Sequence, residues 1–572
     1  MSVKEIIFTN EARCQDCYRC VRVCPVKAVG WKDGQAYVEK DRCIHCGTCI
    51  KECPQQAKAY RNDLYKAKRL LREGLTAISV APSFAGLFPE WMAKRLPSAL
   101  RRLGFSVIAE TAVGVSHHVH HLIPEIQSSS GRFVLDSSCP AFIEFAEKYE
   151  PSLLNKISQI PSPMVLHAIH LRQTYSHIQH VVFAGPCIAK KKESERPEFS
   201  DLINCVLTFE ELMQWFEEDQ IDLKSCEESD FDDKAESTSR YFPVPTGLER
   251  VLTEEADGAH IPVEAVHGAT NVKDFCQYMK SAPEESGLGE VLWCSHGCIG
   301  GPATGTKLNP FTGKHTVKAY SESQKNSSEQ HNLINNFPKL QFRTSDDTCQ
   351  SEYTEKEINS ILIQMGKNEA KDELNCGACG YNSCRDKAVA ILEGMAQTEM
   401  CIPYMRSLAE QRSDKIIETS PNGIVILDEN LNILKINPSF KRIFRCSNAI
   451  LGKHISYLMD SEPFEHVLYG KLSQIEEKME IRHYNLVLHY IIYKIPEEKQ
   501  IVAIFVNVTN QIRNKEMLET IKRKSLLQAQ ELLNHQIQMA QEMAKFLGEQ
   551  TAKGETLVEN LMKLVDDKSD NQ

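Results

Sequence analysis

The spacing of the cysteines is the feature of this sequence that most directly predicts chemistry. The chain has 572 residues and 21 cysteines, and two segments follow the pattern C-x2-C-x2-C-x3-C-P. Three thiolates at this pitch can surround one face of a cubane iron–sulfur cluster, whereas a zinc site prefers two C-x2-C pairs. The pattern predicts two 4Fe–4S clusters, with zinc as the alternative, and its cysteines are Cys14, Cys17, Cys20, Cys24, Cys43, Cys46, Cys49 and Cys53.

This block resembles the bacterial ferredoxins, in which the fourth cysteine of each run binds the other cluster. The resemblance implies one 4Fe–4S cluster on Cys14, Cys17, Cys20 and Cys53, and a second on Cys43, Cys46, Cys49 and Cys24. We expect residues 1–62 to form a ferredoxin-like domain. It would conduct electrons between a ferredoxin or similar carrier and a site further along the chain.

A second dense block has the spacing C-x2-C-x4-C-x16-C, and its cysteines are Cys376, Cys379, Cys384 and Cys401. Glycines beside them allow the tight backbone turns that a cluster requires. The block looks like the small 4Fe–4S domain of corrinoid iron–sulfur and electron-transport proteins, and zinc is the alternative. We expect a 4Fe–4S domain over residues 366–408 that passes the redox state of the middle domain onward.

Residues 63–345 alternate strand-like and helix-like segments, as an α/β domain does. Four further cysteines follow strand-like runs in this region and stand beside glycine or proline: Cys139, Cys187, Cys294 and Cys298. Loops at strand ends are where α/β folds assemble their sites. The loops that carry these four cysteines are therefore candidates for a functional site.

In order and spacing, these loops resemble the signature loops of the FeFe-hydrogenase large subunit, and Val80–Ser83 extends the likeness. The resemblance implies that the four cysteines hold a 4Fe–4S cluster and that Cys298 bridges it to a diiron subcluster, together the H-cluster. It implies that the diiron pocket is lined by Ala81, Pro82, Ser83 and Lys190. The implied reaction is the reversible heterolysis of dihydrogen, with protons as co-substrate.

The sequence also departs from the pattern of fast hydrogenases. Ser138 stands where they carry a cysteine that passes protons, and a hydroxyl has a far higher pKa than a thiol. Residues 116–121 read Ser-His-His-Val-His-His, without the usual carboxylate. We interpret this segment as an ordinary, partly exposed helix, with a histidine proton relay as the alternative. Gly185 and Leu292 replace methionines that commonly pack against the diiron unit. Turnover should therefore be low.

The C-terminal third looks like a signalling module. Residues 412–510 resemble a PAS domain, beginning with Gly423–Asp428 and Asn437–Phe440, although no PAS ligand can be nominated. Residues 511–572 are rich in helix formers, and an a/d seam of a short coiled coil is formed by Leu533, Ile537, Ala540, Ala544 and Leu547, with Gly548 and Gly554 limiting its length. We expect this helix to form a homodimer or to contact a separate signalling output protein.

Composition narrows the functional classes. A formal charge of −11 argues against nucleic-acid binding. No apolar run approaches the ~18 residues that span a membrane, and no signal peptide precedes the cysteines, so we expect no membrane partner and a cytoplasmic location. An acidic stretch at 217–236 is interpreted as a solvated insertion. The expected fold is multidomain, α/β and α+β, in the order ferredoxin-like, hydrogenase-type, small 4Fe–4S, PAS and helix.

The domain order resembles that of the sensory, PAS-containing FeFe-hydrogenases. The leading hypothesis is a hydrogen or redox sensor that binds dihydrogen at an H-cluster and signals through the PAS domain and C-terminal helix. One alternative is a ferredoxin-linked catalytic hydrogenase with a regulatory tail. The other is a non-catalytic iron–sulfur electron-transfer scaffold in which the PAS domain does the sensing.

Overall fold

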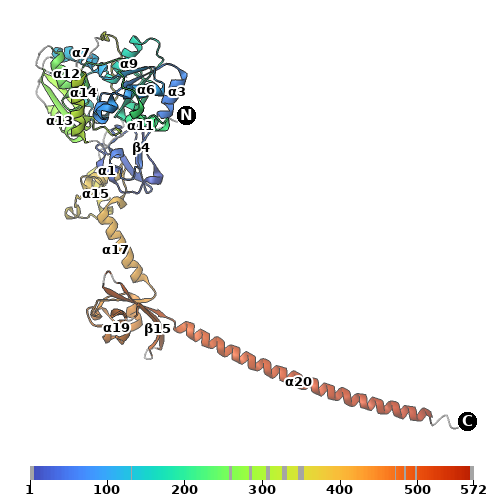
Figure 1. The fold of residues 1–572 in the computed structure, drawn as a ribbon. Helices are drawn as coiled ribbons and strands as arrows, with labels where there is room; N and C mark the ends of the chain where they lie inside the picture. The colour runs from blue at the N-terminus through green and yellow to red at the C-terminus, as the bar shows by residue number, and fades with distance from the viewer. Residues whose placement is uncertain are drawn as a thin grey trace. The chain divides into compact units, whose positions relative to one another are not determined.

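The computed structural model describes residues 5–129, 132–236, 238–256, 261–281, 286–304, 309–324, 331–344, 353–470, 472–481, 485–495, 497 and 499–566. Two compact units make up the chain, Met1–Met405 and Arg406–Gln572 (Figure 1). Residues 345 and 572, where we expected the middle domain and the C-terminal segment to end, lie outside the described residues. Within these ranges, none of the helices combines the length and apolar character that crossing a bilayer requires.

The N-terminal block repeats one small unit. Two antiparallel strand pairs are formed by β1 (Ile7–Thr9) with β4 (Lys58–Tyr60) and by β2 (Val29–Lys32) with β3 (Gln35–Val38). The short helices α1 (Arg19–Val23) and α2 (Thr48–Lys51) follow residues with positive φ, 54° at Tyr18 and 73° at Gly47. Each left-handed residue turns the chain from the start of a cysteine run into a helix that carries the third cysteine of that run.

The middle domain contains two parallel sheets, with strand orders β6-β5-β8-β9 and β10-β11-β7. The strands are apolar and mostly buried, as strands covered on both faces must be. Their bounds are β5 (Thr76–Val80), β6 (Val107–Glu110), β7 (Phe133–Leu135), β8 (His180–Gly185), β9 (Cys205–Thr208), β10 (Val263–His267) and β11 (Gly287–Leu292). The short β12 (Ser295–Cys298) follows β11. Because the strands of each sheet are parallel, the loops that follow them leave from one edge.

Helices cover these sheets (Figure 1). They include α3 (Leu64–Glu73), α4 (Phe84–Leu87), α5 (Glu90–Ala93), α6 (Leu96–Leu103), α7 (Ala112–Ser128), α8 (Pro140–Tyr149), α9 (Pro163–Thr174), α10 (Ala189–Ser194), α11 (Phe209–Glu218), α12 (Gly247–Glu255), α13 (Ala269–Ser281) and α14 (Pro310–Ser323). A capping box between Thr208 and Glu211 starts α11 directly after β9. Proline in the first turn of α8 and α9 fixes their starting φ.

The acidic stretch is only partly solvated, so our interpretation of 217–236 as a solvated insertion is wrong for its second half. Phe231, Asp233 and Ala235 are buried. The Asp232 amide donates to the Ile108 carbonyl oxygen at 2.8 Å, and the Glu110 amide donates to Asp233 O at 3.1 Å. Residues 231–235 therefore lie along β6 and belong to the core.

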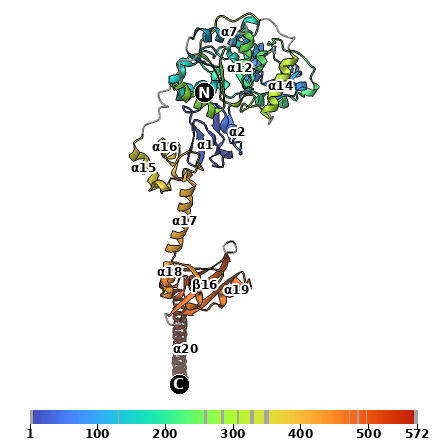
Figure 2. The same ribbon diagram turned by 90° about the vertical axis from the view of Figure 1, so that its left-hand side faces the viewer.

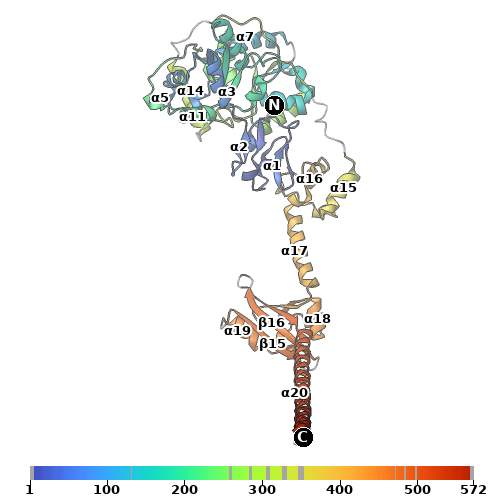
Figure 3. The same ribbon diagram turned by 90° about the vertical axis from the view of Figure 1, so that its right-hand side faces the viewer.

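The block that contains Cys376, Cys379, Cys384 and Cys401, which we call the third cysteine block, packs on the ferredoxin-like block. The whole middle domain separates these two blocks in the sequence. The Trp31 amide donates to the Met395 carbonyl at 3.0 Å, and Arg42 pairs with Glu393 at 2.9 Å. Its helices are α15 (Glu355–Gln364) and α16 (Cys384–Leu392), and Figures 2 and 3 show α16 beside α1. The ferredoxin-like block thus contacts the third cysteine block directly, which the order of the domains along the sequence does not reveal.

The second unit has one antiparallel sheet in the order β14-β13-β17-β16-β15. The strands are β13 (Gly423–Leu427), β14 (Ile433–Ile436), β15 (Gln474–Ile481), β16 (Leu486–Ile495) and β17 (Gln500–Asn507), with α18 (Pro438–Phe444) and α19 (Glu462–Leu468) completing the domain. Phe440, Phe464 and Phe505 fill its core. A Cβ at Gly423 would lie 3.2 Å from the Phe440 Cα, so α18 sits close on the sheet.

Two helices depart from the expected boundaries. Helix α17 (Ile402–Thr419) runs without interruption across the boundary that we placed between 408 and 412. Helix α20 (Thr509–Asp566) continues through Gly548 and Gly554, so these glycines do not end the helix itself. A glycine in an exposed helix costs only about 1 kcal/mol, too little to end so long a helix.

Candidate metal centres

The cysteines of the N-terminal block form two groups. Burial raises the pKa of the Cys49 thiol well above its usual range, and Cys46, Cys24 and Cys43 raise it further. These neighbours place Cys24, from the first run, with the thiols of the second run. The structure therefore gathers Cys24 with Cys43, Cys46 and Cys49.

The other group also combines cysteines of one run with the fourth cysteine of the other run. Burial raises the pKa of Cys20, Lys58 opposes it, and Cys14 and Cys53 raise it again. Backbone amides approach both exchanged cysteines, since Ala28 N donates to Cys24 Sγ and Ala57 N to Cys53 Sγ, each at 3.2 Å. Such donors stabilise a thiolate. Cys17 is exposed at the surface of this block.

The four candidate cysteines of the middle domain converge from separate loops. Cys139 precedes α8, Cys187 follows β8, Cys294 follows β11, and Cys298 ends β12. Burial raises the pKa of Cys294 well above its usual range, and Cys187, Cys139 and Cys298 add to the rise. Neighbouring thiols raise one another's pKa because thiolates repel each other. A positively charged metal cluster bound by all four would remove that repulsion.

Lys190 lies at the same site. Its Nζ donates to Ser162 Oγ at 2.8 Å and to the Ser138 carbonyl at 3.2 Å. Burial raises the pKa of Cys298 to about 12, and Cys187 and Cys139 add to the rise, while Lys190 opposes it. Its ammonium therefore brings positive charge to the thiols, and it is also paired with Glu193 Oε2 at 2.6 Å.

The loop after β5 completes the candidate pocket. The Ala81 amide donates to the Ala184 carbonyl at 2.8 Å, which ties residues 81–83 to the strand that leads to Cys187. The Ser83 side chain is buried, and its hydroxyl has no hydrogen-bond partner within the part of the chain that the structure describes. A buried donor without a partner is costly, so the Ser83 hydroxyl fits a pocket in which a bound group accepts a hydrogen bond from it.

Ser138 lies in a network that the sequence did not predict. Its Oγ donates to Asp136 Oδ1 at 3.1 Å, and His118 Nε2 lies 2.8 Å from the same oxygen. His118 Nδ1 lies 2.9 Å from the Pro161 carbonyl oxygen, so both ring nitrogens face an acceptor. His117 and His118 are both buried, so our interpretation of a partly exposed helix is wrong for them. A carboxylate directly after β7, Asp136, thus contacts this helix through His118.

Glu290 is a second buried carboxylate near this network. The Asp136 amide donates to the Gly289 carbonyl at 2.9 Å, so Asp136 lies on the strand beside Glu290. Burial, Asp136 and Glu249 together raise the pKa of Glu290 to about 8. Hydrogen bonds from the backbone of Glu249 and Thr246 oppose this rise but do not overcome it. A glutamate inside the apolar run Gly287–Leu292 was the sequence signal that could have revealed it.

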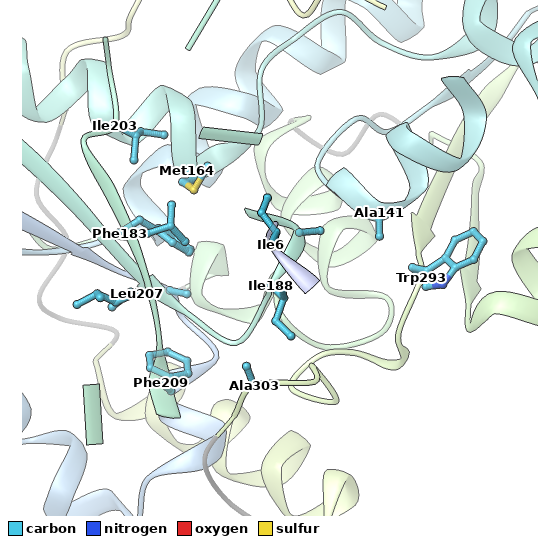
Figure 4. Close-up of a cluster of buried hydrophobic side chains, with 14 of the residues drawn as sticks. Ile6, Ala141, Met164, Phe183, Ile188, Ile203, Leu207, Phe209, Trp293 and Ala303 are labelled. Carbon is cyan, nitrogen blue, oxygen red and sulfur yellow. The ribbon is translucent and has the colours of Figure 1, made fainter. Parts of the chain in front are cut away.

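The glycine at position 185, where a methionine is common in hydrogenases, has a steric explanation. A Cβ at this position would lie 2.6 Å from the Phe183 ring and 3.2 Å from Ala81 Cβ. Figure 4 shows Phe183 in the core that also contains Ile188, Ala141 and Trp293. A methionine at position 185 would therefore require Phe183 to move.

The ferredoxin-like block borders the four-cysteine site. Cys46 is among the thiols that raise the pKa of Cys294, and the Trp293 side chain lowers the pKa of Cys46 against the dominant effect of burial. A Cβ on Gly47 would lie 2.6 Å from Pro302 and 2.9 Å from Ile188. The second cysteine group and the four-cysteine site are thus in direct packing contact.

The third cysteine block forms one pocket, lined by Cys376, Cys379, Cys384 and Cys401. The buried Lys387 lies beside it, and burial lowers the pKa of this lysine while Cys401, Cys379 and Cys384 oppose the effect. Lys27 connects this block with the ferredoxin-like block, because its Nζ donates to the Gly380 carbonyl at 2.7 Å. Burial lowers the pKa of Lys27, and Cys24 from one block and Cys379 from the other both oppose that effect.

Comparison with known proteins agrees with this division. Residues 75–302 match the family model of the iron only hydrogenase large subunit, C-terminal domain. Residues 13–58 match the 4Fe-4S dicluster domain, residues 372–403 an Fe-S cluster model, and residues 411–478 the PAS domain. The fold class expected from the sequence is confirmed.

Iron hydrogenase 1 of Clostridium pasteurianum is 23% identical over 255 residues, which are 36% of this chain and 44% of that protein. Cytosolic Fe-S cluster assembly factor NAR1 of Scheffersomyces stipitis is 32% identical over 137 residues, 21% of this chain and 25% of that protein. The chain spans less than half the length of these two relatives. The solved structure of FeFe-hydrogenase HydA1 from Chlamydomonas reinhardtii is 18% identical, with coverage of 48% of this chain and 91% of that chain and a TM-score of 0.36. The chain therefore combines a hydrogenase-like domain with two iron–sulfur cluster domains and a PAS domain.

Proposed function

We propose that this protein binds dihydrogen at an H-cluster, turns it over slowly, and reports hydrogen or redox state through its PAS domain and C-terminal helix. The observation that carries the proposal is a contrast within one site. The four thiols lie together with Lys190 beside them, and the buried Ser83 hydroxyl has no partner among the described residues. Ser138, in contrast, bonds to Asp136 where a fast hydrogenase would have a proton-passing thiol.

The residues present fit the cofactor. Cys139, Cys187, Cys294 and Cys298 would hold the 4Fe–4S cluster, and Cys298 would also bind the diiron subcluster. Lys190 and Ser83 would donate to its anionic ligands, with Ala81 and Pro82 shaping the pocket. When bound, the group supplies the Lewis acid and base that split dihydrogen.

Proton transfer is the step that this chain's own residues would slow. A serine hydroxyl releases its proton far less readily than a thiol does. Asp136 accepts a hydrogen bond from Ser138 and contacts His118, so a proton can pass from the site to this buried carboxylate. The transfer should be possible but slow, which suits detection better than turnover.

The electrons would leave through the ferredoxin-like block. Its second cysteine group borders the four-cysteine site, and Lys27 connects that group to the third block. We propose two 4Fe–4S clusters in the first block and one in the third. An external ferredoxin or similar carrier would exchange electrons with this chain of clusters.

Signal output would use α20. Its side chains are exposed, and large apolar ones recur along it, including Leu533, Ile537 and Leu547. An apolar seam of this kind is normally covered by a second helix. We propose a homodimer through α20 that also presents a surface to a separate output protein.

The kinetic test compares dihydrogen oxidation by the wild type, Ser138→Cys and Ser137→Cys after maturation of the cofactor. Ser137 is the matched control, because its hydroxyl donates to the Ile160 carbonyl instead of to Asp136. The proposal predicts a slow wild type that only Ser138→Cys accelerates, by roughly 10²-fold. A fast wild type would instead indicate a ferredoxin-linked catalytic hydrogenase with a regulatory tail.

The similarity to NAR1 supports a second candidate function, an iron–sulfur scaffold without hydrogenase chemistry. In that case the four cysteines would hold a 4Fe–4S cluster alone, and the PAS domain would do the sensing. A matured protein with cubane signals but no carbon monoxide or cyanide ligands would favour this alternative.

A further inference from the structure

A cluster of nitrogen and oxygen donors lies outside the cysteine sites. It consists of His170 on α9, Asp233 beside β6 and His331 in the segment 331–344, and we call it the His–Asp–His cluster. One donor atom from each side chain lies within 4.8 Å of the other two. His170 Nε2 is 3.4 Å from Asp233 Oδ2, and His331 Nδ1 is 3.5 Å from Asp233 Oδ1. His170 and Asp233 are buried, and 13% of the His331 side chain is exposed.

These separations suit a bridging cation. Two ligands bound at 2.0–2.1 Å around a tetrahedral zinc ion are about 3.4 Å apart. A charge-assisted hydrogen bond between the same groups would be shorter, about 2.7–2.9 Å. The two nitrogen–carboxylate distances are therefore closer to those of a metal site than to those of direct ion pairs.

The hydrogen bonds around His331 fix which of its nitrogens is free. Its Nε2 lies 2.8 Å from the Lys234 carbonyl, which can only accept, so Nε2 carries the proton. In the neutral ring, Nδ1 then presents its lone pair toward the Asp233 carboxylate. Two acceptors facing each other repel unless a proton or a cation lies between them.

Other side chains hold the remaining two donors in place. His167 Nε2 lies 3.1 Å from Asp233 Oδ2, and His167 Nδ1 lies 2.7 Å from Ser79 Oγ. His117 Nε2 lies 3.2 Å from His170 Nδ1. Metal ligands are commonly oriented by such outer hydrogen bonds.

We propose that His170, Asp233 and His331 bind one divalent transition-metal ion of the zinc class. Two imidazoles with one carboxylate suit zinc or ferrous iron, whereas magnesium and calcium prefer oxygen donors alone. Because the ligands come from α9, residues 231–235 and the segment 331–344, the ion would fasten these pieces together. The site shares no ligand with the proposed iron–sulfur clusters.

The test uses the full chain with its iron–sulfur clusters assembled. The protein is equilibrated with zinc sulfate, desalted, and measured for zinc content and for X-ray absorption at the zinc edge, which iron does not obscure. We expect about one zinc per chain with nitrogen and oxygen ligands at about 2.0 Å and no sulfur at about 2.3 Å. Excess magnesium should not displace it.

Variants locate the ion. His331→Ala and Asp233→Asn should lose the zinc, and His167→Gln should weaken binding by roughly 10- to 100-fold as a positioning change. His177→Ala, an exposed histidine, is the matched control and should retain zinc. Unchanged iron content and circular dichroism would show that each variant is folded, and His331→Gln replaces His331→Ala if the alanine variant is not.

Three results would overturn the proposal. The wild type could retain no zinc, it could bind zinc through sulfur ligands, or a folded His331 variant could retain its nitrogen- and oxygen-bound zinc.

Discussion

The ligand side and the proton side of the four-cysteine site are built on neighbouring strand ends, yet they depart from fast hydrogenases to different degrees. On the ligand side, thiols from separate loops converge beside Lys190. On the proton side, Ser138, Asp136 and His118 form a closed network of hydrogen bonds. On the proposed function, the ability to bind the cofactor and the ability to move protons quickly would be separate properties of one fold.

The largest expected effect comes from the ligand side. Cys187→Ala should abolish dihydrogen oxidation and remove the iron of the four-cysteine site, because it takes away one of the converging donors. Iron analysis and activity after maturation measure both. Cys276→Ala, a buried thiol on α13 outside the set, is the control and should keep iron and activity. Equal losses in both variants would contradict the assigned ligand set.

On the proton side, Asp136→Asn should slow dihydrogen oxidation by roughly 10²-fold, because the amide cannot take up the proton that Ser138 releases. The rate is measured in the matured protein, and infrared spectra check that the cofactor is unchanged. Asp274→Asn, an exposed carboxylate on α13, should leave the rate unaltered. If Asp136→Asn is as fast as the wild type, protons use another route.

Between the two sides, Glu290 makes stability depend on pH. Its folded pKa of about 8 exceeds the usual 4.5, so the folded state binds the extra proton and stability falls as pH rises from about 4.5 to 8. Glu290→Gln should remove this fall. Relative to the wild type, its free energy of unfolding should therefore rise by about 1.4 kcal/mol per pH unit, and the difference should reach a few kcal/mol near pH 8. Denaturation of the variant and of Glu264→Gln, an exposed control on β10, is compared across this range. A parallel pH profile for Glu290→Gln and the wild type would contradict the assignment.

The smallest effect concerns the electron path. Lys27→Gln removes a positive charge beside Cys24 and Cys379 and should make the nearby clusters harder to reduce, by on the order of tens of millivolts. Redox titration followed by electron paramagnetic resonance measures the shift. Lys32→Gln, at the exposed end of β2, is the control. Unchanged reduction potentials in Lys27→Gln would show that the charge of Lys27 does not influence the clusters of the two blocks.

Motifs in the sequence predicted the clustered cysteines, because ligand spacing within a loop is local. The four middle-domain thiols were found by resemblance, since their approach depends on how two sheets pack. Asp136 stands only two residues before Ser138 and was overlooked, whereas its contact with His118 and its position near Glu290 arise only when α7, β7 and β11 pack together. The acidic stretch misled us for the same reason, since burial of Asp233 depends on its pairing with β6.

Infrared spectroscopy of the matured wild-type protein tests the central claim most directly. The account predicts bands of metal-bound carbon monoxide and cyanide that disappear in Cys187→Ala and persist in Cys276→Ala. A protein with its 4Fe–4S clusters intact but without such bands would contradict the proposal that this chain binds dihydrogen at an H-cluster.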